Sequence, residues 1–238
     1  MGAKYSVEKY LDSLPDDVEI IDVSNKNLDY LPDLSRFKKL KELYCHRNKL
    51  TSLPDLPKNL KELCCYNNEL TSLPVLPENL TKLDCHYNKL TSLPVLPKNL
   101  EIIFCDHNDL TSLPDLPKEL ERLDCEYNKL TSLPVLPEKL KKMICFNNKL
   151  TSLPVLPENL IWSFFSENPI REIICYGNLG MMNKQIIIWN NFRYLYYCLK
   201  YKERIWKIRE RIIKKRYHPS YLDDLKEDDD LDEKLGEW

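Results

Sequence analysis

The feature that most constrains the fold of this chain is a repeat of 20 residues. Six consecutive copies run without insertion or deletion, from LKELYCHRNKLTSLPDLPKN at Leu40 to LKKMICFNNKLTSLPVLPEN at Leu140. A looser copy begins at Val18, offset by 22 residues, with Lys26 at the position where the other copies carry Asn, and a diverging half-copy follows at Leu160. One unit of this length cannot bury its own apolar face, so the units must stack and share one continuous core.

Each copy combines a strand-like segment with a proline-rich segment. The Leu-x-x-Leu-x-Cys segment ends in the two-residue spacing of a strand. The Asn that follows, at positions 48, 68, 88, 108, 128, 148 and 168, can turn the chain and hydrogen-bond buried backbone groups. Two prolines three residues apart in LPxLP remove backbone donors and fix φ, which excludes a helix. We therefore predict a parallel sheet on one side of a solenoid and an extended or polyproline-like return on the other.

The segments LKELYCHRNKL and LTKLDCHYNKL follow the pattern L-x-x-L-x-L-x-x-N-x-L, with Cys in place of one Leu. This pattern resembles the leucine-rich repeat family in its shortest form. The resemblance implies an α/β solenoid with one short strand per repeat, in which a parallel, concave β-sheet lies opposite an extended convex side. We expect a short N-terminal helical cap and a C-terminal helical segment to close the two ends.

Two narrower resemblances concern the source of the repeats. The phrase LTSLPxLPxxL is similar to the repeats of enterobacterial secreted effectors that end in a ubiquitin-ligase domain. The ligase motif Cys-x-Asp does not follow the repeats here, because neither Cys175 nor Cys198 has Asp two positions further on. The cysteine position and the segment RYHPSYL look like the leucine-rich repeat proteins of giant amoeba-infecting DNA viruses. That resemblance implies an intracellular protein whose partner is a host protein.

We divide the chain into four segments, which are an N-terminal cap helix at 1–17, about seven or eight leucine-rich repeats at 18–178, a basic helical segment at 179–218 and an acidic tail at 219–238. Ser6 precedes a one-sided apolar set and is predicted to cap the first helix. The 193–217 part of the basic segment contains ten Lys or Arg and two Glu, with apolar residues at helical spacing. We expect the acidic tail either to be mobile or to fold back on the basic helix by charge attraction.

Six cysteines occupy one position of successive repeats, where strand alternation points them into the core. They are Cys45, Cys65, Cys85, Cys105, Cys125 and Cys145. A free cysteine behaves as a small apolar residue, so core packing is favoured over a column of metal-bound thiolates. Cys85 and His86 fall on opposite faces and cannot share an ion. Cys64 is predicted to face outward between His46 and His86, a zinc-like set of residue types, but ordinary surface contacts are favoured and no metal site is expected.

The outward strand positions form the candidate binding surface, which is rich in aromatic and acidic side chains. The residues predicted to contact a partner are Tyr44, His46, Tyr66, Asp84, His86, Phe104, Asp106, Asp124, Glu126, Phe146, Trp162 and Phe164. Aromatic side chains make large rigid contacts and suit protein recognition. Seven acidic residues against four basic ones on this face argue against a nucleic-acid backbone as the ligand. Ile144, Phe146, Trp162 and Phe164 make an apolar patch that either anchors a partner or is covered by the C-terminal segment.

The sequence favours a monomeric protein-interaction scaffold without catalysis or a cofactor, because no catalytic triad, paired-carboxylate or metal-ligand spacing occurs. The alternative is an N-myristoylated peripheral membrane protein. MGAKYS matches the acylation pattern at Gly2, and the basic 193–217 helix would supply the second membrane signal that a single myristoyl chain needs. The N-terminus has no apolar core region and the chain has no run of 18 apolar residues, which predicts an intracellular, cytoplasmic protein.

Overall fold

The computed structural model describes residues 6–172, 174 and 177–200, and the chain divides into two compact units. The first unit, Met1–Asn190, contains every strand that the structure describes, and the second, Asn191–Trp238, is described only as far as Lys200. Three predicted features lie outside the described residues: the acylation site Gly2, the 201–217 part of the basic helix and the acidic tail.

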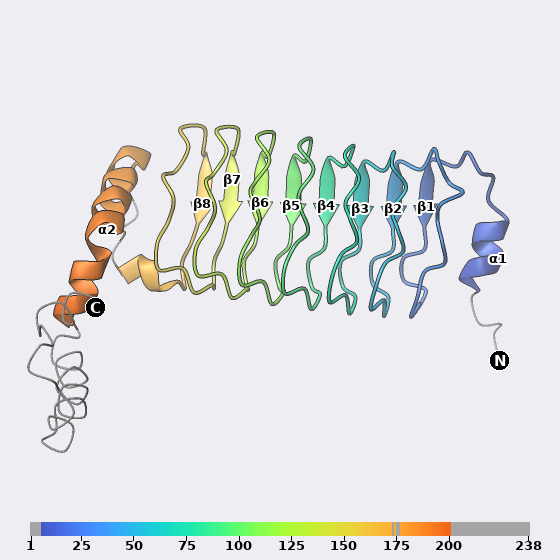
Figure 1. Cartoon of the computed structure of the whole chain (residues 1–238), viewed down its shortest axis with the longest axis horizontal. Helices are drawn as coiled ribbons and strands as arrows, with labels where there is room; N and C mark the ends of the chain where they lie inside the picture. The colour runs from blue at the N-terminus through green and yellow to red at the C-terminus, as the bar shows by residue number, and fades with distance from the viewer. Residues whose placement is uncertain (1–5, 173, 175–176, 201–238) are drawn as a thin grey trace, which may run out of the picture. The chain divides into compact units, whose positions relative to one another are not determined.

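Eight short strands form one parallel sheet in sequence order, as Figure 1 shows from β1 in blue to β8 in yellow. They are β1 (Ile20–Asp22), β2 (Glu42–Tyr44), β3 (Glu62–Cys64), β4 (Lys82–Asp84), β5 (Ile102–Phe104), β6 (Arg122–Asp124), β7 (Lys142–Ile144) and β8 (Trp162–Phe164). Each strand pairs with the equivalent residues of the next repeat. The first pair, Ile20 with Glu42, keeps the 22-residue offset of the looser copy.

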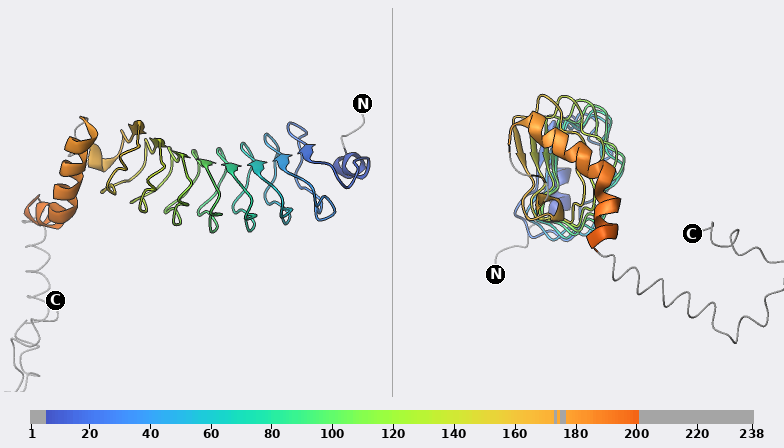
Figure 2. Two further views of the ribbon diagram at one scale, coloured as in Figure 1. Left: turned by 90° about the horizontal axis from the view of Figure 1, so that it is seen from above. Right: turned by 90° about the vertical axis from the view of Figure 1, so that its left-hand side faces the viewer.

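The strands lie on one side of the stacked repeats and the returning segments on the other (Figure 2). The returning segment at 92–97 forms neither helix nor strand, as the LPxLP motif predicts. The predicted leucine-rich repeat solenoid is therefore confirmed. We call the side of the sheet that faces away from the core the concave face. It carries the first and third residues of each strand and the two residues directly before the repeating asparagine.

The core repeats with the sequence. In the repeat that begins at Leu40, the residues Leu40, Leu43, Cys45 and Leu50 are all 0% exposed, and the equivalent positions are just as buried in the next five repeats. The six cysteines at this position are free thiols. Burial raises the pKa of each thiol, to about 12 in Cys145 and further in the other five. They therefore pack as uncharged apolar groups, as predicted.

The prediction that Cys64 faces outward is only half right. Cys64 pairs in register with Tyr44 and Asp84, which places it on the concave face, but only 6% of its surface is exposed. Strands about 4.8 Å apart bring the larger neighbouring side chains over so small a residue. Burial, followed by the negative charge of Asp84, raises the pKa of the Cys64 thiol to about 11. Cys64 is thus a covered thiol rather than a surface ligand.

The asparagine of each repeat joins two turns through its side-chain amide. Asn108 accepts a hydrogen bond from the backbone N–H of Leu90 at 2.9 Å and donates to the carbonyls of Cys85 and Cys105 at 3.1 and 3.2 Å. The other repeats use the same pattern, and Asn48 also accepts from the backbone of Lys26 in the looser copy. Buried backbone groups at the end of every strand are paired in this way.

Helices close both ends of the first unit. Helix α1 (Val7–Asp12) has Ser6 as its N-cap and buries Val7 and Leu11. After the short turn η1 (Pro169–Glu172), helix α2 (Leu179–Lys200) begins, and its residues Met182, Ile186 and Trp189 are buried. None of the helices in the described ranges is long and apolar enough to cross a membrane.

The first half of α2 packs on the returning segment of the last complete repeat. Trp189 Nε1 donates to the carbonyl of Thr151 at 2.7 Å, and Asn190 donates to the carbonyl of Leu153 at 2.8 Å. These contacts lie away from the apolar patch on the concave face. Residues 179–190 of α2 therefore pack on the returning segment. That the patch anchors a partner and that the C-terminal segment covers it both stay predictions.

We expect Asn108→Ala to lower the free energy of unfolding by about 3 kcal/mol, because it leaves one buried N–H and two buried carbonyls without their partner. Asn99→Ala is the matched control, since Asn99 is exposed and donates a single hydrogen bond to the carbonyl of Glu78. Urea denaturation followed by circular dichroism measures both. Equal losses in the two variants would contradict the role given to the buried amide.

We expect the six core cysteines to resist alkylation in the folded protein, because the thiolate is the reactive form and burial disfavours it. Iodoacetamide labelling with and without denaturant, read by peptide mass spectrometry, measures each cysteine separately. Labelling of Cys85 or Cys105 under native conditions, at the rate found in denaturant, would show that this core is open to solvent.

Candidate functional site

A continuous row of rings crosses the concave face from the second repeat to the last. The rings of this row, which we call the ring row, are His46, Tyr66, His86, Tyr87, His107, Tyr127, Phe146 and Phe164. Neighbouring ring centroids are 4.0 to 5.5 Å apart, and five of the seven contacts are stacked. Every repeat from β2 to β8 contributes at least one ring.

Three rings of the row come from a position with an unusual backbone. Tyr87, His107 and Tyr127 directly precede the asparagine, and their φ angles are 50°, 51° and 47°, in the left-handed region. This conformation costs a residue with a side chain about 1–2 kcal/mol. Hydrogen bonds to the next repeat hold it in place, such as the one from the N–H of His107 to the carbonyl of Glu126 at 3.0 Å. The left-handed turn puts these rings in line with those of the preceding position.

An acidic centre lies beside the middle of the ring row and consists of Asp84, Asp106, Asp124 and Glu126. Asp84 is 2.5 Å from His86 Nδ1, and Asp106 is 3.0 Å from His107 Nδ1. Asp124 is only 9% exposed. Its burial, followed by the charges of Asp106 and Glu126, raises the pKa of Asp124 to about 6. Burial and the charge of Asp106 also raise the pKa of Glu126. The centre therefore concentrates negative charge in partly buried surroundings.

The apolar patch lies at the C-terminal end of the row. Trp162 is 60% exposed and Phe164 is 39% exposed, while Ile144 and Phe146 are half-buried. The rings of Phe146 and Phe164 are stacked at 5.4 Å. Exposed aromatic side chains of this size on a folded surface are characteristic of binding sites.

The structure brings most of the predicted surface residues together. Five of them, His46, Tyr66, His86, Phe146 and Phe164, belong to the ring row, and the four acidic ones make the acidic centre. Tyr44, Phe104 and Trp162 lie beside these groups on their strands, where Tyr44 donates a hydrogen bond to Glu42 and the Arg122 guanidinium lies over the Phe104 ring. That these residues bind a partner stays a prediction.

The predicted set missed Tyr87, His107 and Tyr127. Strand alternation ends before these three positions and gives no direction to their side chains, so the predicted contact set does not include them. The signal that could have found them is an aromatic residue or histidine directly before the repeating asparagine in three successive repeats.

Comparison with known proteins identifies the class. Residues 58–98 match the family described as Leucine Rich repeats (2 copies). A Shigella effector LRR domain is 30% identical, with a TM-score of 0.59, over 68% of this chain and 74% of that one. This chain belongs to the leucine-rich repeat family.

Two further structures show which members of the family it is similar to. YopM from Yersinia enterocolitica WA-314 is 39% identical, with a TM-score of 0.64, over 66% of this chain and 34% of that one. YopM from Yersinia pestis, a leucine-rich effector protein, is 33% identical, with a TM-score of 0.55, over 63% of this chain and 49% of that one. The chain thus spans about a third to a half of the length of these two proteins.

The predicted likeness to the repeats of bacterial effectors is therefore confirmed, whereas the likeness to viral proteins stays a prediction. No curated protein sequence matches the chain.

We expect His86 to titrate above its ordinary pKa of 6.5. Burial of the ring lowers the pKa of His86, but the hydrogen bond to Asp84 and the charges of Asp84, Asp106 and Asp124 outweigh it. The protonated ring therefore stabilises the fold below pH 6.5, and this stabilisation is lost as the pH rises through the pKa of the folded state. Asp84→Asn should lower the pKa of His86 and flatten this dependence of stability on pH.

NMR titration of the histidine ring protons measures the pKa of His86 directly. Glu69→Gln is the control, because Glu69 forms an exposed pair with Lys89 in the same part of the solenoid. A pKa of His86 that stays the same in Asp84→Asn would show that the 2.5 Å contact between the two side chains does not persist in solution.

Proposed function

We propose that this chain is a scaffold without catalytic activity that binds a protein partner through the ring row and the apolar patch of its concave face. The leucine-rich repeat fold is typical of protein-interaction scaffolds, and its stacked repeats present one extended surface. The observation that carries the proposal is the uninterrupted series of rings from His46 to Phe164, ending in the exposed Trp162.

The carboxylates, rings and apolar patch of the concave face indicate which side chains a partner segment would carry. The acidic centre complements Lys or Arg side chains, and the neighbouring ring faces can stack with a guanidinium group. Trp162 and Phe164 would contact an apolar side chain of the same segment. We therefore propose a partner segment that is basic in its middle and apolar at one end. The partner is proposed to be a host-cell protein met in an intracellular compartment, a location that the free thiols of the repeats support.

Affinity purification followed by mass spectrometry tests the proposal with three forms of the chain. The first is the wild type and the second is the concave variant Tyr66→Ala, Trp162→Ala, Phe164→Ala. The third is a convex control, Val75→Ala, Val95→Ala, Val135→Ala, whose residues are 87%, 86% and 85% exposed. We expect the wild type and the convex control to retain the same partner. The concave variant should bind this partner at least about 100-fold more weakly, since each of the three lost anchor residues contributes about 1–2 kcal/mol.

Direct binding of the purified partner to each form then gives the affinities, with melting curves to show that all three are folded. Higher salt should weaken the interaction if the acidic centre takes part. A partner held equally by the wild type and the concave variant would rule out the concave face. A partner lost instead from Gly2→Ala, together with flotation on vesicles, would favour the lipid-anchored alternative.

A further inference from the structure

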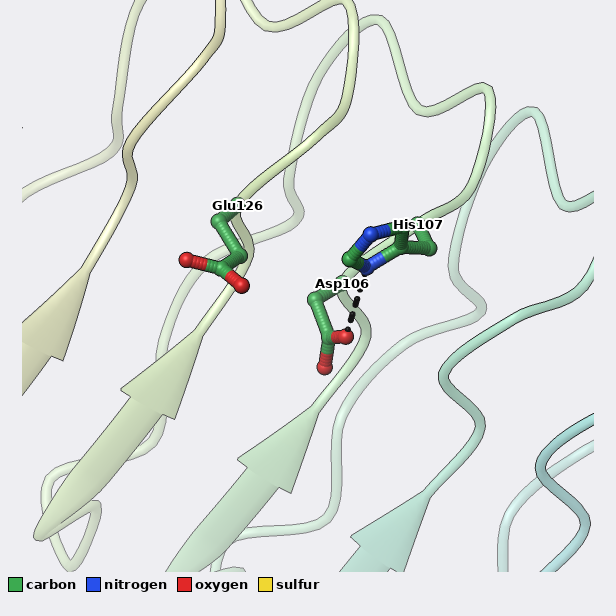
Figure 3. A group of neighbouring side chains, drawn as sticks. All are labelled: Asp106, His107 and Glu126. Atoms are coloured by element: carbon green, nitrogen blue, oxygen red, sulfur yellow. Dashed lines mark hydrogen bonds and ion pairs between the residues drawn. The ribbon is translucent and has the colours of Figure 1, made fainter.

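Three side chains with metal-binding atoms meet at the centre of the concave face. Asp106 and His107 follow β5, and Glu126 follows β6. One ligand atom from each residue lies within 4.8 Å of the other two. Figure 3 shows the imidazole of His107 beside the carboxylate of Asp106, with the carboxylate of Glu126 on the neighbouring strand end. All three are partly exposed, so an ion can reach them from solvent.

The distances are close to those of a metal site. Asp106 Oδ2 and His107 Nδ1 are 3.0 Å apart. Two ligand atoms held about 2.1 Å from one tetrahedral ion are separated by roughly 3.4 Å, so small side-chain rotations would place an ion between this pair. Glu126 is within reach of the same point by rotation of its longer side chain.

Stacking fixes the ring of His107. Its centroid lies 4.0 Å from that of Tyr87 and 4.3 Å from that of Tyr127. The two tyrosines stack on the imidazole, and its Nδ1 atom is directed at the carboxylate of Asp106. A ligand held in one orientation loses little entropy when an ion binds.

Asp124 supplies an independent observation. It is 9% exposed, and its Oδ1 atom has no hydrogen-bond partner among the residues that the structure describes. Asp124 is the last residue of β6, two positions before Glu126, so its carboxylate lies on the same face of the sheet and repels those of Asp106 and Glu126. The nearest positive group, Arg122 Nη2, is 4.0 Å from Oδ2. A divalent cation would offset this repulsion, as bound ions do where carboxylates gather.

We propose that Asp106, His107 and Glu126 bind one divalent transition-metal ion of the zinc type. An imidazole nitrogen with two carboxylates suits Zn²⁺ or Co²⁺ better than Mg²⁺ or Ca²⁺, which favour oxygen ligands alone. Three protein ligands leave a fourth position for water or for a group of a partner. This proposal reverses the sequence-based expectation of no metal site, and it does not depend on the proposed partner, since the free chain carries all three ligands.

Calorimetric titration of the full chain with ZnCl₂, after dialysis against a chelator, tests the site. His107→Phe keeps a ring between the two tyrosines but removes both nitrogens, and Glu126→Gln keeps the shape of the side chain but removes its charge. His86→Phe is the matched control, because His86 has the same kind of contact with Asp84 outside the cluster. We expect zinc affinity to fall at least about tenfold in His107→Phe and in Glu126→Gln and to stay unchanged in His86→Phe.

NMR with Co²⁺ detects the bound ion itself, and a purely structural effect of the substitutions would not reproduce its signal. Because the ion is paramagnetic, its addition should shift or broaden the ring signals of His107 at lower concentrations than those of His46. Three results would overturn the proposal: no zinc binding by the wild type, zinc binding that is unchanged in both ligand variants, or an equal loss in His86→Phe. The cysteines, His46 and His218 are present in every form, so zinc bound by them appears as the second of these results.

Discussion

The side-chain amide of the repeating asparagine is the interaction on which the rest of this structure depends. In Asn108 it accepts a hydrogen bond from one buried N–H and donates to two buried carbonyls, and these groups belong to two adjacent turns. These backbone groups are buried where each strand ends, and they would otherwise be left without partners at a cost of several kcal/mol. Because the amide recurs every 20 residues, it sets the shape of every turn and keeps successive repeats in register.

The ring row is a consequence of that register. Strands in a sheet are about 4.8 Å apart, which is close to the separation at which aromatic rings stack. Side chains at equivalent positions of adjacent repeats therefore meet face to face, as Tyr66 does with His46 and His86. The left-handed residue before the asparagine continues the row when the ring moves one position along the sequence, as it does from His86 to Tyr87. The same turn brings His107 next to Asp106.

The sequence predicted the parts of this molecule that depend on periodicity alone. The sheet, its order, the buried leucines and cysteines and the opposite orientation of Cys85 and His86 all follow from a fixed repeat and from strand alternation. The sequence did not predict the side-chain positions that depend on neighbouring strands or on the geometry of a turn. Cys64 is buried because larger residues flank it, and His107 approaches Asp106 because its φ is positive. The docking of Trp189 on Thr151 joins positions 38 residues apart, which no local pattern specifies.

The repeats are almost interchangeable in their core but not on their concave face. Histidine and tyrosine occupy the first part of the ring row, carboxylates accompany its middle, and phenylalanine and tryptophan lie at its end. The side-chain chemistry of the concave face therefore changes from one end of the solenoid to the other, although the backbone repeats. A linear partner segment that complements all three parts of the row can bind in only one chain direction and at only one register. A surface built from identical repeats would allow the same segment to bind at several registers.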